Sequence, residues 1–445
     1  MLRDETATNW DKRLKEMQHI SMASGGHGLN EPLALLGLAY LSRNIGIRFD
    51  AAASAPSKLV EELAIAVEQH HGFSKQPFSQ YLVSNILRIE PFAIIEWLPI
   101  AATVEADSAF REWLLYKIDD LEFPTHHVTP SSVAQLIVSL FTDETARSIL
   151  DPACGTGGLL SAAARRFEEN HTYLVGQESY GETWAWANLR FAIQGYRNVK
   201  LELFNILKCQ DDRQREKVER FDIILTNPPF GMQAKISEMP WLQFGSELLQ
   251  NNLPLRISSE TAHVLAAFEK LSWSGTAAII VPNGFLFRGG TDRRIRESLV
   301  TRGAVSAVIG LPARLFSPVT TIETSILVLQ RSREEQHNSE ILFIDAREQG
   351  RRQGHKMVLS DEAVDRIGSA FHERQPQHGF SNLVSREKLE IEDYSLIPAL
   401  YVERPDTEKR SDQDRRSKIM ELDERYTLLV DEYEALRSQL TDPQS

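Results

Sequence analysis

The chain has 445 residues, of which 42% are hydrophobic and 25% charged, and its formal net charge at pH 7 is −13. This composition is typical of a globular protein with two or three domains, and no run approaches the roughly 18 uncharged apolar residues that a membrane span needs. The chain has no signal-peptide core and only two cysteines, so we expect a cytoplasmic protein with no membrane partner. The histidine pairs have no Cys or acidic partner at ligand spacing, so we expect no bound metal.

Residues 1–120 form the first predicted domain, which we expect to be helical. Apolar residues recur there at helical spacing, and Gly and Pro separate the runs. The predicted helices are Leu33–Leu41, Leu59–Val67, Tyr81–Ile86 and Ile94–Ile100. We find no catalytic or binding motif in this region and interpret it as a packing or interaction domain.

Residues 121–402 form the second predicted domain, in which short apolar runs alternate with helix-length segments. This alternation predicts an α/β fold with a doubly wound, mainly parallel sheet. The predicted strands are Ser148–Asp151, Tyr173–Gln177, Val199–Phe204, Phe221–Thr226, Ala277–Pro282, Val305–Leu311 and Thr324–Gln330. The predicted helices are Leu159–Phe167, Glu182–Gln194, Ala262–Leu271 and Asp292–Val300. Because such sheets bind ligands at the carboxyl ends of their strands, motifs that directly follow a strand are candidate sites.

A glycine-rich turn follows the first predicted strand. Asp151 is followed by Pro-Ala-Cys-Gly-Thr-Gly-Gly and then by a helical run. Glycine has no Cβ, so a ligand can approach the backbone closely at such a turn and meet the N-terminus of the helix. The turn lacks the Gly-Lys-Ser/Thr ending of a phosphate-binding P-loop. The alternative is a glycine turn that serves only packing.

Glu178 ends the second predicted strand, roughly 20 residues beyond the glycine turn, which is the spacing found in nucleotide-binding folds. An acid at this place accepts hydrogen bonds from ribose hydroxyls. The alternative is an acid that stabilises the N-terminus of the next helix through the helix dipole.

Asn227–Pro228–Pro229–Phe230 ends the strand predicted at Phe221–Thr226. Two consecutive prolines end the ladder and hold the backbone extended, so the Asn227 side chain and the Pro228 carbonyl form two fixed acceptors. An aromatic amine is a poor nucleophile because its lone pair is delocalised, and two accepted N–H bonds help to localise that pair for attack on a sulfonium methyl group. Phe230 offers a face on which a flipped base can stack. The alternative is a structural Pro-Pro turn.

The cysteines argue against methylation of cytosine C5, which needs a thiolate nucleophile, usually in a Pro-Cys pair. Cys154 follows Ala153, and Cys209 follows Lys208. We expect Cys154 to be a small buried residue.

Together these motifs closely resemble the modification (methyltransferase) subunit of type I restriction-modification systems, over about residues 120–402. The resemblance rests on the loop Asp151–Gly158, the strand end Gly176–Glu178 and the tetrapeptide Asn227–Phe230. Further similar elements are Thr129–Pro130, Val281–Gly284, Gly289–Gly290 with Arg296, Leu311–Pro312, Thr324–Leu327 and Tyr394–Tyr401.

The resemblance implies a class I, Rossmann-like methyltransferase domain that uses S-adenosylmethionine and has Asn227, Pro228, Pro229 and Phe230 as its catalytic residues. The implied cofactor residues are Thr129, Pro130, Asp151, Ala153, Gly155, Thr156, Gly157, Glu178, Asn205 and Asn227. The cofactor motif precedes the catalytic motif, as in gamma-type amino methyltransferases, and with Asn-Pro-Pro-Phe this order favours adenine N6 over cytosine N4. Phe316 is a second candidate for stacking on the base, opposite Phe230.

The chain departs from the family at Asn205, which stands where the family usually has Asp in a Gly-Asp-Thr-Leu element. We expect the Asn205 amide oxygen to bind the amine of the cofactor's adenine. No target-recognition domain is visible. In the family a separate specificity subunit contacts the DNA sequence, so the resemblance implies duplex DNA and such a subunit as partners, with a restriction nuclease subunit as a further one. The acidic net charge then means that the positive surface is local, or that another subunit provides most of the DNA binding.

Residues 403–445 form the third predicted segment, a helix similar to a coiled-coil strand. Its apolar positions alternate at intervals of three and four residues, which gives a narrow seam. They are Ile419, Leu422, Tyr426, Leu429, Tyr433, Leu436 and Leu440. The resemblance implies that two copies of this chain dock such helices on one specificity subunit. The alternative is a helix that folds back on its own domain.

Two other functions remain open at this point. A protein-glutamine methyltransferase also uses Asn-Pro-Pro followed by an aromatic residue, because an amide nitrogen poses the same chemical problem, but it lacks the segments after residue 282. A catalytically silent, cofactor-binding scaffold is the second alternative, and the intact Asn227–Phe230 argues against it.

Overall fold

A computed structural model describes residues 2–26, 28–48, 55–73, 77–119, 121, 129–141, 146–167, 172–208, 219–239, 256–317, 320–331, 340–354, 356–403 and 420. The predicted C-terminal seam and Cys209 lie outside the described residues, so their predicted roles stay predictions. Among the described helices, none combines the length and the apolar character that crossing a membrane requires.

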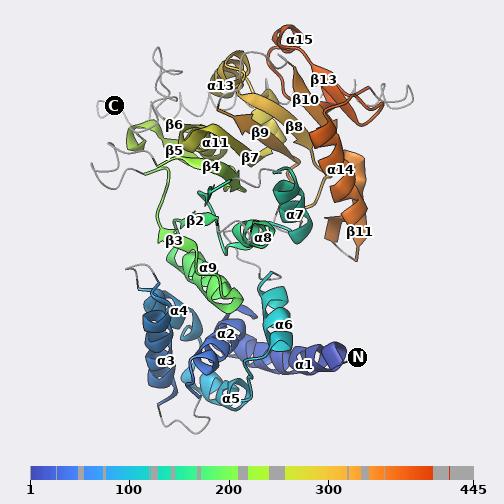
Figure 1. The fold of residues 1–445 in the computed structure, drawn as a ribbon. Helices are drawn as coiled ribbons and strands as arrows, with labels where there is room; N and C mark the ends of the chain where they lie inside the picture. Colours follow the sequence, from blue (N-terminus) through green and yellow to red (C-terminus); the bar gives the residue numbers. More distant parts are fainter. Residues whose placement is uncertain are drawn as a thin grey trace, which may run out of the picture.

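Within the described residues of the N-terminal part, six helices are found (Figure 1). They are α1 (Leu2–Ala23), α2 (Asn30–Asn44), α3 (Pro56–His71), α4 (Phe78–Ile86), α5 (Pro91–Ala101) and α6 (Ser108–Asp119). The four runs predicted from apolar spacing fall inside α2 to α5 and are confirmed as helices. In α3 the buried residues are Val60, Leu63, Ala64 and Val67, which is the spacing of one helix face. Pro56 begins this helix, and Gly72 ends it in a left-handed conformation.

A sheet of nine strands forms the centre of the rest of the chain, in the order β13-β10-β8-β9-β7-β4-β1-β2-β3. The strands are β1 (Ser148–Asp151), β2 (Tyr173–Glu178), β3 (Val199–Leu203), β4 (Phe221–Thr226), β7 (Leu271–Pro282), β8 (Val305–Gly310), β9 (Thr324–Gln330), β10 (Ile341–Asp345) and β13 (Ser381–Val384). Only β9 and β13 run antiparallel to their neighbours. The predicted doubly wound, mainly parallel sheet is therefore confirmed. The strands β10 and β13 were not among those predicted.

Helices cover both faces of this sheet. On one face lie α7 (Ser131–Ser139), α8 (Gly158–Arg166), α9 (Gly181–Gln194) and α14 (Asp361–Glu373). On the other lie α11 (Ser259–Lys270), α12 (Asn283–Phe287), α13 (Gly290–Thr301) and α15 (Arg386–Ile391). Successive strand residues point to opposite faces, as Ile223 and Leu225 join the first core and Ile224 joins the second.

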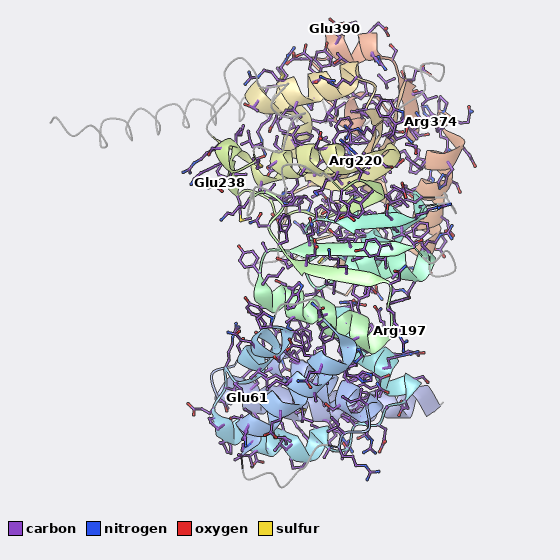
Figure 2. The ribbon with its side chains drawn as sticks, turned by 60° about the vertical axis from the view of Figure 1, so that its left-hand side comes forward. Glu61, Arg197, Arg220, Glu238, Arg374 and Glu390 are labelled. Carbon is purple, nitrogen blue, oxygen red and sulfur yellow. The ribbon has the colours of Figure 1, made fainter. Side chains whose placement is uncertain are left out.

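The helix α9 joins the N-terminal helices to the sheet, and in Figure 2 it lies between them. The N-terminal helices pack on its outer side, where Leu189 would touch any side chain placed at Gly37. Two ion pairs flank this contact, Arg88 Nη2 to Glu182 Oε2 at 2.7 Å and Arg190 Nη1 to Asp119 Oδ1 at 2.6 Å. The N-terminal helices therefore share one continuous apolar core with the first face of the sheet.

Candidate active site

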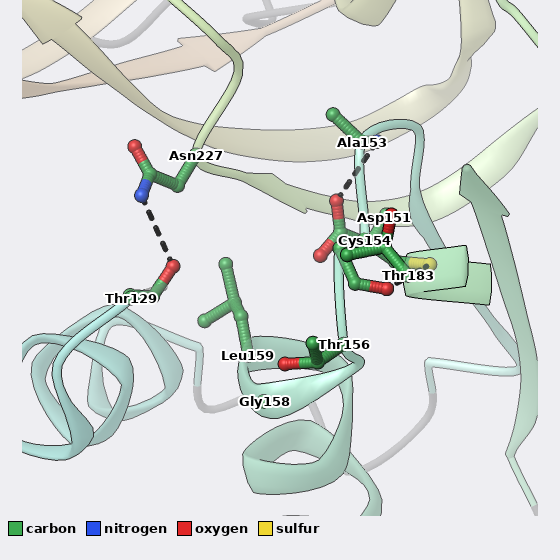
Figure 3. Close-up of a pocket in the computed structure, with 10 residues that line it drawn as sticks. Thr129, Asp151, Ala153, Cys154, Thr156, Gly158, Leu159, Thr183 and Asn227 are labelled. Atoms are coloured by element: carbon green, nitrogen blue, oxygen red, sulfur yellow. Dashed lines mark hydrogen bonds between the residues drawn. The ribbon is translucent and has the colours of Figure 1, made fainter. Parts of the chain in front are cut away.

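The candidate site lies where the strand order reverses. β1 has β2 and β3 on one side and β4 and β7 on the other, and all five strands are parallel. The connections that leave neighbouring strands at such a point diverge, which opens a crevice at the carboxyl ends. The glycine turn follows β1, Glu178 ends β2, and Asn227 follows β4. The sequence placed its candidate motifs at these three strand ends, and the fold brings Gly155, Glu178 and Asn227 to one pocket. Figure 3 shows residues of the turn near Asn227 and Thr129.

Two glycines of the turn have the left-handed conformation that favours glycine, Gly155 with φ 55° and Gly157 with φ 79°. A Cβ at Gly157 would lie 3.0 Å from the Phe191 ring, so this glycine allows the turn to pack on α9. A Cβ at Gly155 would meet no atom within 4 Å, so here the backbone borders open space. Gly155 therefore leaves room for a ligand, whereas Gly157 serves packing.

Glu178 is 6% exposed and organises the turn. Its Oε2 accepts a hydrogen bond from the Gly155 backbone N–H at 3.0 Å, and its Oε1 accepts one from the Tyr180 N–H at 2.8 Å. Oε1 also accepts a hydrogen bond from Ser179 Oγ at 3.3 Å, so the remaining acceptor capacity of the carboxylate is on Oε2. The carboxylate faces the crevice and lines a pocket there. The structure thus joins β2 to the glycine turn through the side chain that the sequence assigned to ribose.

Asp151 is buried below the same turn, and its Oδ1 accepts a hydrogen bond from the Ala153 N–H at 3.1 Å. Burial, with a smaller contribution from the nearby Glu178, raises the pKa of Asp151 to about 7. Burial likewise raises the pKa of the Cys154 thiol well above its usual value, so this buried cysteine is not a thiolate at neutral pH. The expectation that Cys154 is a small buried residue is confirmed.

Asn227 lies at the end of β4 and is 8% exposed. Its Nδ2 donates a hydrogen bond to Thr129 Oγ1 at 3.2 Å (Figure 3). Its Oδ1 is buried and has no hydrogen-bond partner among the described residues. An unsatisfied buried acceptor costs about 1–3 kcal/mol, so the site is arranged to receive a donor at this atom.

The residues after Asn227 are held from α11. The Pro229 carbonyl accepts a hydrogen bond from Ser259 Oγ at 2.6 Å, and the Gly231 N–H donates to the buried Glu260 Oε2 at 3.2 Å. Phe230 is partly buried against the first core. The Asn-Pro-Pro-Phe segment is therefore supported on both sides of Phe230.

Two adjoining pockets contain most of the predicted residues. Those in the first pocket are Thr129, Asp151, Ala153, Gly155, Thr156 and Asn227, and those in the second are Ala153, Gly155, Glu178, Asn205, Asn227 and Pro229. The predicted residues that line neither pocket are Pro130, Gly157, Pro228, Phe230 and Phe316. Pro130 precedes the first turn of α7.

Asn205 and Phe316 are less accessible to a ligand than the sequence predicts. Asn205 lies in the second pocket, and its Oδ1 already accepts a hydrogen bond from the Leu207 N–H at 2.9 Å, so only the remaining lone pair is left for a ligand. Phe316 is 5% exposed and packed into the first core. Its predicted role as a stacking partner for the base gains no support from this position.

The structure adds residues that sequence patterns missed. Those lining the pockets are Pro152, Cys154, Gly158, Leu159, Ser179, Tyr180, Thr183, Phe204, Ile206, Leu207, Met232 and His263. Most of them lie in the segments that follow β1, β2 and β3, and that position was the available signal. His263 comes from the middle of α11 and gave no such signal. Its Nδ1–H donates to the Ser259 carbonyl at 2.7 Å, and burial lowers its pKa to about 4, so the imidazole is neutral at pH 7.

Comparisons with known proteins agree with this geometry. The family model described as N-6 DNA Methylase matches residues 112–410. The chain is 28% identical over 313 residues to the methylase subunit of the type I restriction enzyme MjaVII from Methanocaldococcus jannaschii. This alignment covers 66% of this chain and 52% of the relative. It is 28% identical over 335 residues to the MpnII methylase subunit from Mycoplasma pneumoniae, which covers 71% of this chain and 58% of the relative.

Among solved structures, the type I restriction-modification methyltransferase subunit from Streptococcus thermophilus superimposes with a TM-score of 0.69 at 19% identity. The superposition covers 89% of this chain and 100% of that one. The fold is therefore shared over nearly the whole chain. The chain nevertheless spans little more than half the length of the two curated relatives, 52% and 58%.

Proposed function

The chain belongs to the N-6 DNA methylase family, and from this premise we propose that it transfers the methyl group of S-adenosylmethionine to the N6 amine of adenine in duplex DNA. We propose that it does so as the modification subunit of a restriction-modification or related defence system. The names of its curated relatives, which are methylase subunits of type I restriction enzymes, support this proposal.

The observation that carries the proposal is the buried, unpartnered Oδ1 of Asn227. This oxygen can accept one N–H of the target amine, and the Pro228 carbonyl can accept the other. With both N–H groups bound, the nitrogen lone pair is less delocalised and points toward the methyl group. Thr129 fixes the orientation of the amide by accepting from its Nδ2. The proposed role of Asn227 is therefore to bind the amine most strongly in the transition state.

The residues around the glycine turn fit the cofactor that the family implies. The open space at Gly155 gives a ligand access to the backbone, and Glu178 presents a carboxylate to a ribose diol. Asp151 lines the pocket that contains Asn227 and provides a negative charge near the sulfonium when it is ionised. When bound, S-adenosylmethionine supplies the electrophilic methyl group, and the chain's residues position it.

We further propose that residues 1–120, 121–402 and 403–445 act as an interaction domain, the methyltransferase domain and a docking helix. The proposed partners are duplex DNA, one specificity subunit that binds two copies of this chain, and a restriction nuclease subunit. Partner association is supported by a solved neighbour whose title describes complex assembly of a type I restriction-modification system.

The decisive experiment measures transfer of a labelled methyl group to duplex DNA with the partner subunit supplied, followed by mass spectrometry of the nucleosides. We expect N6-methyladenine from the wild type and a loss of at least about 100-fold in rate for Asn227→Ala, the scale of removing one preorganised polar group. Calorimetry should give the same cofactor affinity for both proteins. Near-normal turnover by Asn227→Ala, or methylated cytosine as the product, would contradict the proposal.

A further inference from the structure

Three arginines lie at the same edge of the sheet as the candidate active site. β8 and β10 run parallel to β1 and β4, so the segments that follow them leave the sheet at its carboxyl edge. Arg314 follows β8. Arg351 and Arg352 belong to β11 (Gly350–Gln353), which follows β10 and pairs antiparallel with β12 (Lys356–Leu359). We name Arg314, Arg351 and Arg352 the basic edge.

The two segments that carry these arginines touch each other. The Ala346 N–H donates a hydrogen bond to the Gly310 carbonyl at 3.0 Å, which ties the ends of β10 and β8 together. A Cβ at Gly350 would lie 2.8 Å from Pro312, so the backbone of β11 is pressed against the loop after β8. Arg314 and the β11 arginines therefore belong to one continuous surface.

The basic edge is free to meet a ligand. All three side chains are exposed, and none of them lies within ion-pair distance of another described residue, although the exposed Glu362 of α14 is near enough to Arg351 to interact with its charge. Arg314 has φ 65°, a conformation uncommon in residues other than glycine, between the buried Pro312 and Leu315. By contrast, Arg347 is neutralised by a bidentate pair with the buried Asp345, with both contacts at 2.8 Å.

A short series of contacts links this surface to the catalytic loop. The Leu359 N–H, at the end of β12, donates a hydrogen bond to Ser132 Oγ at 3.3 Å in the first turn of α7. Thr129, which immediately precedes that helix with Pro130, accepts the hydrogen bond from Asn227. The hairpin is thus anchored to the first turn of α7, which follows the residue that holds Asn227.

We propose that the basic edge binds the phosphate backbone of the duplex DNA whose base enters the site at Asn227. This inference rests on the proposed function and adds the surface by which the chain holds its substrate. Residues 347–356 contain four Lys or Arg and one acid, in a chain whose net charge is −13. Arginine binds phosphate oxygens through a rigid fork of donors. With Arg347 paired to Asp345, the unpaired arginines Arg351 and Arg352 make this edge a local positive surface in an acidic chain.

The test is a salt titration of the affinity of the full chain for a mixed-sequence fluorescent duplex. Each lost phosphate contact reduces the slope of log K against log salt by about 0.9, so Arg351→Gln with Arg352→Gln should reduce it by about 1.8. At 0.1 M salt this corresponds to a loss of affinity of about 60-fold. Arg314→Gln alone should reduce the slope by about 0.9. Arg351→Lys with Arg352→Lys keeps both charges and should retain most of the affinity.

The matched control is Arg302→Gln with Lys388→Gln. These two exposed residues lie at the opposite, amino edge, because Arg302 precedes β8 and Lys388 follows the antiparallel β13. The control should bind DNA like the wild type, and an equal loss in the control would overturn the inference by showing a net-charge effect. The double variant Arg351→Gln with Arg352→Gln is called the β11 variant. DNA binding by the β11 variant with the affinity of the wild type would also overturn the inference. If that variant bound DNA normally but no longer co-purified with the partner subunit, the edge would be a protein-docking surface and the inference would be wrong.

Methyl transfer by the wild type in the presence of the partner separates this inference from the proposed function. If the wild type transfers methyl groups and the β11 variant has unchanged DNA affinity, only the inference fails. If the wild type transfers no methyl group, the proposed function fails.

Discussion

Replacing Glu178 by Gln tests the cofactor assignment at a single carboxylate. The side chain keeps its size but loses its charge and one of its two acceptor oxygens. In the structure these oxygens accept from the Gly155 and Tyr180 N–H groups and from Ser179 Oγ, and Glu178 lines the second pocket. A hydrogen bond to a charged group contributes about 1.5–3 kcal/mol, and we expect the variant to lose one such bond to the ribose diol. The dissociation constant of S-adenosylmethionine should therefore rise by about 10- to 150-fold.

The assay is isothermal titration calorimetry of the full chain with S-adenosylmethionine, accompanied by a thermal melt. The melt is needed because Glu178→Gln also weakens three hydrogen bonds within the fold, those from Gly155, Ser179 and Tyr180. Glu202→Gln is the matched control, since Glu202 pairs with Gln177 in the register of β2 and β3, carries the same charge and lines neither pocket. We expect the control to keep the wild-type affinity. If Glu178→Gln bound the cofactor within twofold of the wild type, or if Glu202→Gln lost as much, the assignment of Glu178 to the ribose would be refuted.

Three further predictions follow from the site and from the sequence. Burial raises the pKa of Asp151 to about 7, and a sulfonium cation favours the ionised carboxylate, so cofactor binding should release a proton and tighten as pH rises from 6 to 8. Calorimetry in buffers of different ionisation enthalpy measures this proton release, and Asp151→Asn should abolish it. If the observed binding enthalpy of that variant still depended on the buffer as in the wild type, Asp151 would be excluded as the source of the proton. Phe230→Ala should weaken binding of DNA with an extruded adenine by about 1–3 kcal/mol and leave cofactor affinity unchanged, whereas an equal loss for fully paired and extruded DNA would argue against stacking. Deleting residues 419–445 should abolish assembly with the partner in light scattering while cofactor binding persists, and co-purification of the truncated chain would show that docking occurs elsewhere.

Local sequence signals were sufficient for most of the elements that build the site. The strands at 148–151, 221–226 and 324–330 have the predicted bounds, because each is a short apolar run, and the first two are followed directly by Pro152 and Asn227. The glycine turn, Glu178 and Asn227 were found for the same reason, since each lies at the end of such a run. The strand β13, with the sequence Ser-Asn-Leu-Val, carries little periodicity and was missed; it is defined by its pairing with β10.

Tertiary structure alone decided how these parts meet. The order of the strands, with the antiparallel β9 between β7 and β8, depends on pairing between distant segments that no local propensity encodes. Asn227 and Thr129 are 98 residues apart, and their hydrogen bond exists only because β4 and the start of α7 converge. The pKa of Asp151 rises through burial, and His263 enters the pocket from the middle of a helix. The sequence by itself determined which side chains stand at strand ends. Their distances, their partners and the solvation of their charges were set by packing, because the free energy of a buried polar group depends on neighbours that come from every part of the chain.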